Sequence, residues 1–404
     1  MSVNIDTGTT AGGTRGPIWE SGIWALLLVM MPVGVVLFLV PATINMVMKH
    51  FHLQEGLGGL QIFTFQFGFL ISALTITGVL KKCRIKSVAA GSILCVFAFL
   101  LVAAVAPSYP LLLISYIFVG YFNGILFTLS GVYATHVLSK RITVIQGYSF
   151  GLLGLGYVVG SAIAGLVEYA GISWRWAIAS PGLVMLPFVF VVVLAKLRPV
   201  SGVARLSGSV LRQAFDFDRK LFTVLTFSVF LAAGGYMAIV NWSVAFLENQ
   251  RGMVLGAAHI VLAAIGLGVI VGRVMAARLA AKYKATLVVL AAALASIVLT
   301  FFAPIPQNGT FDSVLIVLAC ACSAGIYPIL LGEATAFPAS ISPSVYTILT
   351  ASVVAGASVF PFVIGLLLEH VGRVQGMCII AAIFLLLFAM LAYKWRFTGE
   401  KASQ

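Results

Sequence analysis

Residues 22–48 read GIWALLLVMMPVGVVLFLVPATINMVM, a run of 27 residues without a charged side chain. The hydrocarbon core of a bilayer is about 30 Å thick, and a helix needs about 20 apolar residues to cross it. A helix satisfies its backbone hydrogen bonds internally, as the membrane interior requires. This stretch therefore predicts a transmembrane helix.

Eleven more apolar stretches of similar length follow along the chain. The twelve predicted spans are 22–48, 58–80, 87–107, 109–138, 142–170, 174–196, 221–246, 254–276, 286–304, 313–338, 347–369 and 374–395. The 404 residues are 61% hydrophobic and only 9% charged, which excludes a soluble domain. The sequence predicts an all-α membrane protein with twelve transmembrane helices.

Basic residues gather in alternate gaps between the spans. With a cytoplasmic N-terminus, 20 of the 24 lysines and arginines fall on the cytoplasmic side, and four fall outside: Lys49, Arg175, Arg251 and Arg373. Basic loops are retained in the cytoplasm, so both termini are predicted to lie inside, at a bacterial inner membrane. The net charge of +13 is read as this topology signal, helped by contact with anionic lipids, and not as a nucleic-acid surface.

The longest interior polar stretch divides the spans six and six. The predicted parts are a disordered cytoplasmic tail at 1–21, a six-helix bundle at 22–196, a cytoplasmic linker at 197–220, a second bundle at 221–396 and a tail at 397–404. Two matches support a duplication: Gly78-Val-Leu-Lys precedes Gly272-Arg-Val-Met by 194 residues, and Glu168-Tyr-Ala-Gly precedes Glu369-His-Val-Gly by 201. Such repeats place a substrate site between two halves.

Several motifs resemble the major facilitator superfamily along nearly the whole chain. Gly78-Val-Leu-Lys-Lys-Cys-Arg-Ile-Lys is similar to its loop motif G-x-L-x-D-R-x-G-R-R, with Lys82 in place of the aspartate. Gly325-Ile-Tyr-Pro, Phe360-Pro and Phe118-Val-Gly-Tyr-Phe-Asn-Gly are similar to the fucose–galactose–glucose:proton symporter branch, although span one lacks that branch's acidic residue. The resemblance implies two pseudo-symmetric six-helix bundles and transport by alternating access.

Glu333 is the one acidic residue that the sequence places well inside a span. Intramembrane carboxylates are costly, and they usually mark a proton or substrate route. Burial favours the protonated form of such a group, which suits reversible protonation. We predict that Glu333 couples transport to protons. The alternative is a structural acid, bonded to a neighbouring helix or placed near the inner interface.

Seven neutral polar or aromatic residues near mid-span are predicted to contact the substrate: Gln66, Asn123, Tyr157, Tyr236, Asn241, Trp242 and Tyr327. They lie in spans two, four, five, seven and ten, which line the cavity of the superfamily that the chain resembles. Aromatic faces and amides together suit a polyhydroxylated or small polar solute. Alternatively, the amides join helices and the tyrosines anchor them at the membrane interface.

Arg273, near the cytoplasmic end of span eight, is a candidate contact for an anionic substrate. Alternatively, its side chain reaches the interface, as long basic side chains at helix ends do. His259 is expected to be a helix-packing or gate residue. No metal or cofactor is expected, because Met46, Met48, His50 and His52 alternate and therefore point to opposite faces of a helix.

We predict a monomeric secondary active transporter that moves a small polar solute, sugar-like or another small metabolite, together with protons. The alternatives are proton-coupled efflux of drugs or metabolites, a non-transporting membrane sensor and a membrane-embedded enzyme. The sequence has no G-x-x-x-x-G-K-[ST] stretch, so direct use of ATP is not expected. It also lacks H-E-x-x-H and paired intramembrane aspartates, so no catalytic function is expected.

Overall fold

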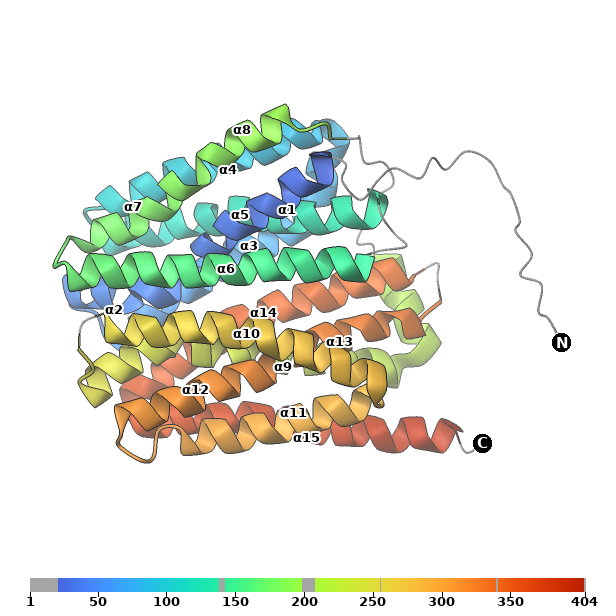
Figure 1. The fold of residues 1–404 in the computed structure, drawn as a ribbon. Helices are drawn as coiled ribbons and strands as arrows, with labels where there is room; N and C mark the ends of the chain where they lie inside the picture. The colour runs from blue at the N-terminus through green and yellow to red at the C-terminus, as the bar shows by residue number, and fades with distance from the viewer. Residues whose placement is uncertain (1–20, 138–141, 198–207, 255, 339–340, 403–404) are drawn as a thin grey trace.

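The structure is a computed structural model that describes residues 21–137, 142–197, 208–254, 256–338 and 341–402. Within these residues the regular structure is helical, and no strand occurs. The helices form two stacked groups, one from each half of the chain (Figure 1). Residues 1–20 of the predicted tail at 1–21 lie outside the described residues, and Ser21 already belongs to a helix.

The described residues of the N-terminal half form eight helices. They are α1 (Ser21–Leu37), α2 (Leu39–Phe51), α3 (Glu55–Lys82), α4 (Ile85–Val105), α5 (Tyr109–Val137), α6 (Ile142–Tyr169), α7 (Trp174–Met185) and α8 (Pro187–Leu194).

The C-terminal half contains α9 (Gly208–Arg251), α10 (Ala257–Lys282), α11 (Ala285–Phe302), α12 (Gly309–Ala324), α13 (Ile326–Gly332), the 3-10 turn η2 (Glu333–Ala336), α14 (Ser342–His370) and α15 (Arg373–Ala402). Across both halves, twelve helical stretches of the described chain are long and apolar enough to cross a membrane. The predicted twelve-span all-α fold is confirmed.

Three predicted spans are interrupted near their middle beside a proline. Span one breaks between α1 and α2, where Pro41 has no N–H to donate to the carbonyl of Leu37. Span six breaks between α7 and α8, where Pro187 has no N–H to donate to the carbonyl of Leu183. Span ten breaks at Gly325, between α12 and α13, where Pro328 leaves the carbonyl of Ala324 without its helical donor. Interrupted helices are a common feature of transporter binding sites, because they expose backbone groups at mid-membrane depth.

Helix α9 begins inside the segment that the sequence assigns to the linker at 197–220. It starts at Gly208 and bends at Asp218, whose φ and ψ are −154° and 88°. The Asp218 carboxylate accepts a hydrogen bond of 3.0 Å from the backbone N–H of Leu221, so it caps the helix that follows. Residues 198–207 of that linker lie outside the described residues. Helix α15 likewise continues to Ala402, past the predicted boundary at 396.

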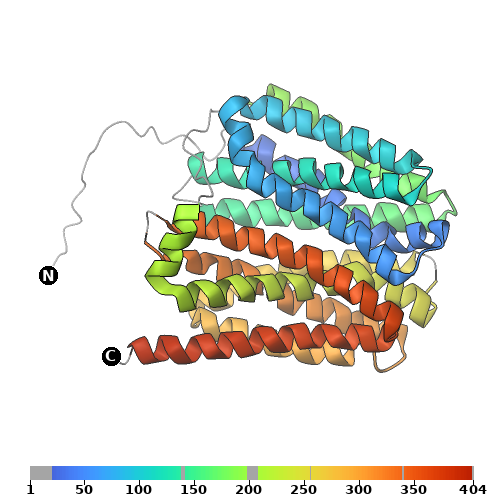
Figure 2. The same cartoon turned by 180° about the vertical axis from the view of Figure 1, so that it is seen from behind.

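The first residues of α1 and the last residues of α15 lie at the same end of the bundle, which we call the terminal end (Figure 1). At the opposite end, the distal end, α6 and α9 finish and α3 and α10 begin. The two halves meet along α14, which packs on both α3 and α9, and along α6 with α10 (Figure 2).

Candidate functional site

Arg273 lies deeper in the bundle than its predicted place near the end of span eight. Helix α10 continues to Lys282, nine residues beyond Arg273, which corresponds to about 13 Å of helix. The guanidinium donates a hydrogen bond of 2.5 Å to the Tyr327 hydroxyl. Its central carbon also lies 4.8 Å from the ring centre of Phe150, a residue of the other half. Arg273 thus contacts both halves of the protein.

Three of the predicted tyrosines converge on this arginine. Tyr327 is hydrogen-bonded to the Arg273 guanidinium, and Tyr157 and Tyr236 lie near enough for charge on their hydroxyls to act on it. Tyr157 also stacks on Phe38, at a ring-centre distance of 3.9 Å, beside the break between α1 and α2. We call Arg273 and these three tyrosines the central site. It joins α6, α9, α10 and α13 and lies beside the breaks in spans one and ten.

The central site carries a positive charge without a matching negative one. Within the described residues, no aspartate or glutamate is paired with Arg273. The Nε of Arg273 and the hydroxyl of Tyr236 are buried and have no hydrogen-bond partner in the same part of the chain. A guanidinium presents a planar fork of donors that matches a carboxylate or phosphate. The site can therefore bind an anion.

The other predicted contacts hold helices in place. The Asn123 amide lies 3.4 Å from the Val33 carbonyl of α1, and the Asn241 amide donates to Met237 of its own helix. The Trp242 indole donates a 2.8 Å hydrogen bond to the Pro361 carbonyl, so it joins α9 to α14. Gln66 is buried on α3. The contacts of Asn123 and Trp242 match the alternative in which polar groups join helices.

Glu333 lies where α13 passes into the η2 turn, and it forms an ion pair with Lys394 of α15. Both residues belong to the C-terminal half, and only 4% of the Lys394 side chain is exposed. Three further carboxylates, which the sequence places at or next to span ends, are also buried by the packing of neighbouring helices: Glu168, Glu248 and Asp312.

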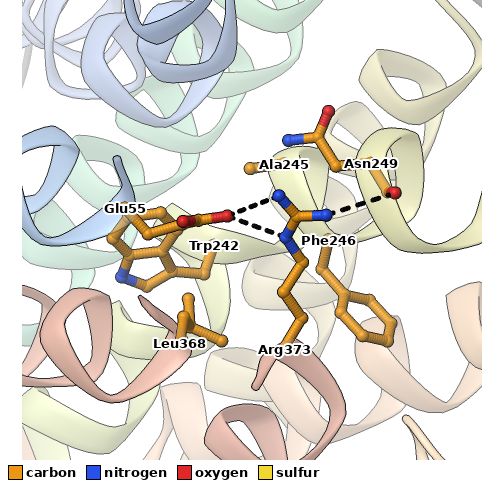
Figure 3. Close-up of a pocket in the computed structure, with 7 residues that line it drawn as sticks. All are labelled: Glu55, Trp242, Ala245, Phe246, Asn249, Leu368 and Arg373. Carbon is orange, nitrogen blue, oxygen red and sulfur yellow. Dashed lines mark hydrogen bonds and ion pairs between the residues drawn. The ribbon is translucent and has the colours of Figure 1, made fainter. Parts of the chain in front are cut away.

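Polar contacts between the halves gather at the distal end. Arg373, at the start of α15, forms an ion pair of 2.7 Å with Glu55 of α3, beside a small pocket lined by Trp242 (Figure 3). The carboxylate of Glu369 accepts a 2.9 Å hydrogen bond from the backbone N–H of Gly56. These contacts hold the distal ends of the two halves together.

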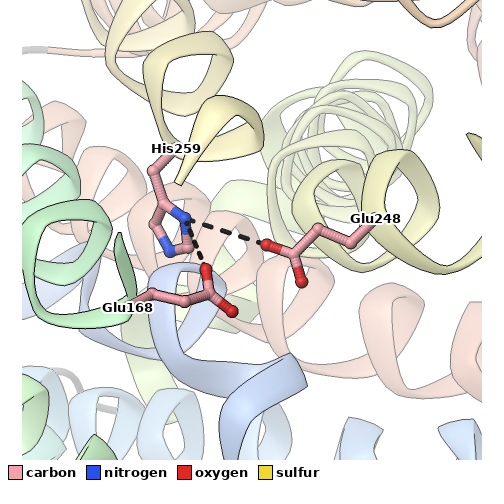
Figure 4. Close-up of side chains that lie close together, drawn as sticks. All are labelled: Glu168, Glu248 and His259. Carbon is pink, nitrogen blue, oxygen red and sulfur yellow. Dashed lines mark ion pairs between the residues drawn. The ribbon is translucent and has the colours of Figure 1, made fainter. Parts of the chain in front are cut away.

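Another distal contact brings Glu168 of α6, Glu248 of α9 and His259 of α10 together; we call these three residues the distal cluster (Figure 4). The sequence marked His259 as a packing or gate residue and missed both glutamates as its partners. The only signal was their place at the ends of spans five and seven, next to apolar sequence. The sequence around each glutamate does not indicate that the ends of these two spans meet in the fold.

Comparison with known proteins identifies the family. The sequence matches the Major Facilitator Superfamily over residues 23–336. A search of curated proteins finds no match.

The sequence contains one motif that is typical of hydrolases, because Gly147-Tyr-Ser-Phe-Gly fits the pattern G-x-S-x-G. In this protein the motif lies on the continuous helix α6 and not on the strand-to-helix turn that this pattern requires.

Solved structures share the fold. An inward-facing, unoccupied bacterial homologue of the human lysosomal transporter Spinster has a TM-score of 0.76 and 13% identity, with 93% of this chain and 97% of that chain covered. A nucleoside transporter has a TM-score of 0.76 and 14% identity, with 92% and 99% covered. A fucose:proton symporter from E. coli, of the branch that the sequence resembles, has a TM-score of 0.64 and 17% identity, with 93% and 98% covered.

At these identities the solved structures support the fold, and the sequence match supports the family. Members of this family are integral, multi-pass membrane transporters and not enzymes. This chain belongs to the major facilitator superfamily.

Proposed function

We propose that this protein is a secondary transporter that moves a small organic anion, such as a carboxylate, together with a proton, by alternating access. The observation that carries the proposal is the guanidinium of Arg273, whose Nε is buried, which has no acidic partner in the described chain and which lies between the two halves. A buried charge without a partner is costly, so a bound anion would stabilise this site.

The three tyrosines extend the site beyond the charge. Their hydroxyls offer hydrogen bonds to further oxygens of the solute, and their rings offer apolar surface. The solute contacts come from α6 of one half and from α9, α10 and α13 of the other. They would break and form again when the two halves move against each other during transport. The affinity of this site for the solute would therefore differ between the states that are open to either side of the membrane.

A neutral, sugar-like solute is the second candidate. The tyrosine hydroxyls favour it, and the similar structures include a fucose:proton symporter. In this case Arg273 would donate hydrogen bonds to hydroxyl groups without neutralisation of its charge. Efflux of the same solute uses the same site, so the direction of transport depends on the gradients and not on the site.

We further propose that the terminal end faces the cytoplasm of a bacterium and that the protein works as a monomer. Lysines and arginines flank the turns at that end, for example Lys82 and Arg84 between α3 and α4, and Lys282 and Lys284 between α10 and α11. Basic residues of short loops remain on the cytoplasmic side. The distal end, where the halves meet, would then face outward.

A thermal-shift screen of the purified protein tests the solute class. Monocarboxylates, dicarboxylates, phosphorylated metabolites and neutral sugars are added at equal concentration, because a ligand of the folded state raises the melting temperature. We expect an organic anion to stabilise the wild type and to lose this effect in Arg273→Gln. Arg278→Gln is the matched control, since Arg278 is exposed on the same helix.

Stabilisation of the wild type by a neutral sugar and not by any anion would favour the second candidate. The absence of any stabilising anion would contradict the proposed solute class. Uptake of the identified ligand into liposomes then measures transport itself, and an imposed pH gradient measures its coupling to protons.

A further inference from the structure

The distal cluster brings three proton-accepting atoms from both halves close together. The Nδ1 atom of His259 lies 3.3 Å from Oε2 of Glu168 and 3.9 Å from Oε1 of Glu248 (Figure 4). The side chains are 2%, 9% and 4% exposed for His259, Glu168 and Glu248. None of these three atoms has a hydrogen-bond partner in the described part of the chain.

The other nitrogen of His259 determines what Nδ1 can do. Nε2 lies 2.8 Å from the carbonyl oxygen of Ala42 in α2, and a carbonyl oxygen can only accept a hydrogen bond. Nε2 therefore carries the hydrogen, and a neutral ring would direct a lone pair from Nδ1 at two carboxylate oxygens. This arrangement is repulsive unless a positive charge lies between the three atoms.

The neighbouring charges show how large that positive charge must be. Lys49 of α2, about half exposed, lies 3.4 Å from Oε2 of Glu248 and is the other charged group that acts on the cluster within the described residues. Asn45 of α2 donates a hydrogen bond to the same oxygen. Two carboxylates and one ammonium leave a single negative charge. One proton balances it, whereas a divalent cation would leave an excess of one positive charge.

We propose that the distal cluster binds one proton, shared between Nδ1 of His259 and the two carboxylates, and that this proton holds the distal ends of the two halves together. Glu168 belongs to the N-terminal half, whereas Glu248 and His259 belong to the C-terminal half. With the proton, the imidazolium attracts both carboxylates; without it, Glu168 and Glu248 repel each other across the interface. The inference rests on the proposed alternating access and names the proton site of that cycle.

The direction of the pH effect follows from linkage. The closed distal end binds the proton more tightly than an open end, where water solvates the three side chains. Lowering the pH therefore shifts the population towards the closed state. Because one proton is involved, the ratio of open to closed molecules rises by at most about tenfold for each unit of increase in pH.

The experiment measures the distance between spin labels at two exposed distal positions, Ile172 after α6 and Val254 after α9. The full-length protein is labelled at Ile172→Cys and Val254→Cys after its five native cysteines have been replaced. Distances are recorded without solute in lipid nanodiscs from pH 5 to pH 9. We expect one short distance at low pH and a growing population of long distances as the pH rises.

Glu168→Gln is the decisive variant, because it removes one negative charge and keeps the shape of the side chain. We expect the short distance to persist at every pH, with less than a twofold change in its population. Glu369→Gln is the matched control: it removes another carboxylate that joins the halves at the distal end but lies outside the cluster. It should retain the pH dependence of the wild type.

Distances in the wild type that do not change with pH, or a Glu168→Gln variant that retains the full pH dependence, would overturn the proposal. Closure by added Zn²⁺ at constant pH, lost in His259→Gln, would also overturn it and identify a divalent-metal site. The Arg273→Gln variant should keep the pH-dependent distances. A protein that binds no organic anion but shows these distances would thus refute the proposed solute and support the proton site.

Discussion

The central site and the distal cluster are both buried between the two halves, but their charges are unbalanced in opposite senses. Arg273 is a cation without an acidic partner in the described chain, and the distal cluster has one carboxylate more than Lys49 can balance. A third buried group, the Glu333–Lys394 pair, is balanced and lies within one half. The comparison indicates that unbalanced charge lies at the interface between the halves, where the proposed alternating access would move them against each other.

The two unbalanced sites complement each other. An anion at the central site and a proton at the distal cluster would together add no net charge to the protein. The pair Glu333–Lys394 offers the contrast, because its partners stay together when the halves separate.

The largest effect is expected from Arg273→Gln. Truncation of one member of a buried charged pair costs about 2–5 kcal/mol, so solute affinity should fall at least about 30-fold. Arg273→Lys keeps the charge but loses the planar fork of donors. The affinity of this variant for the solute should therefore lie between that of the wild type and that of Arg273→Gln. Titration calorimetry with the anion found in the screen provides the measurement. Equal affinity in all three proteins would remove Arg273 from the solute site.

Gly272→Ala should weaken the central site without removing a charge. A Cβ atom at Gly272 would lie 2.0 Å from the carbonyl oxygen of Ala321, so α10 must move away from α12. Overpacking of this kind costs about 1–3 kcal/mol, and the shift would displace the adjacent Arg273. We expect a lower melting temperature and weaker solute binding. Gly151→Ala, on α6, is the control, because the added Cβ meets no atom within 4 Å.

Transport of one anion with one proton should be electroneutral. An inwardly directed pH gradient of one unit should raise solute accumulation about tenfold, because one unit corresponds to about 1.4 kcal/mol. A membrane potential imposed with potassium and valinomycin should change the rate less than twofold. Both are measured by uptake of labelled solute into liposomes. Accumulation that follows the potential and ignores the pH gradient would contradict the opposite and equal charges of the two sites.

The smallest effect on transport is expected from Glu333→Gln. The variant breaks the ion pair with Lys394 and should lower the stability of the C-terminal half, by about 1–3 kcal/mol for a buried group that loses its charged partner. Its pH-dependent accumulation and its distal distances should match the wild type. If Glu333→Gln abolished proton-driven accumulation while Glu168→Gln retained it, Glu333 would be the coupling carboxylate that the sequence indicated.

Part of the central site could be predicted from the sequence. Tyr157, Tyr236 and Tyr327 stand out because polar aromatic residues in apolar spans need partners, and Arg273 stands out because a charge there is rare. Asn123, Asn241 and Trp242 carry the same signal, yet they bond to helices. The sequence of a transmembrane segment does not show whether a polar side chain bonds to a helix backbone or faces the central site.

The distal cluster could not be predicted in the same way. Glu168 and Glu248 sit at the ends of predicted spans, where water usually solvates carboxylates, and they are 80 residues apart. Their burial depends on the ends of α6, α9 and α10 meeting across the two halves. The same is true of Glu55 and Arg373, which pair over more than 300 residues of sequence.

We could infer from the amino-acid sequence alone that the chain crosses a membrane twelve times, that it divides into two related halves, and where its basic residues lie along the chain. These properties follow from the transfer of apolar side chains into lipid and from loop charge, which are properties of local composition. Which charges have partners became visible only in the packed helices. Partners are set by contacts between distant segments, and burial between two halves gives an unpaired charge its large free energy.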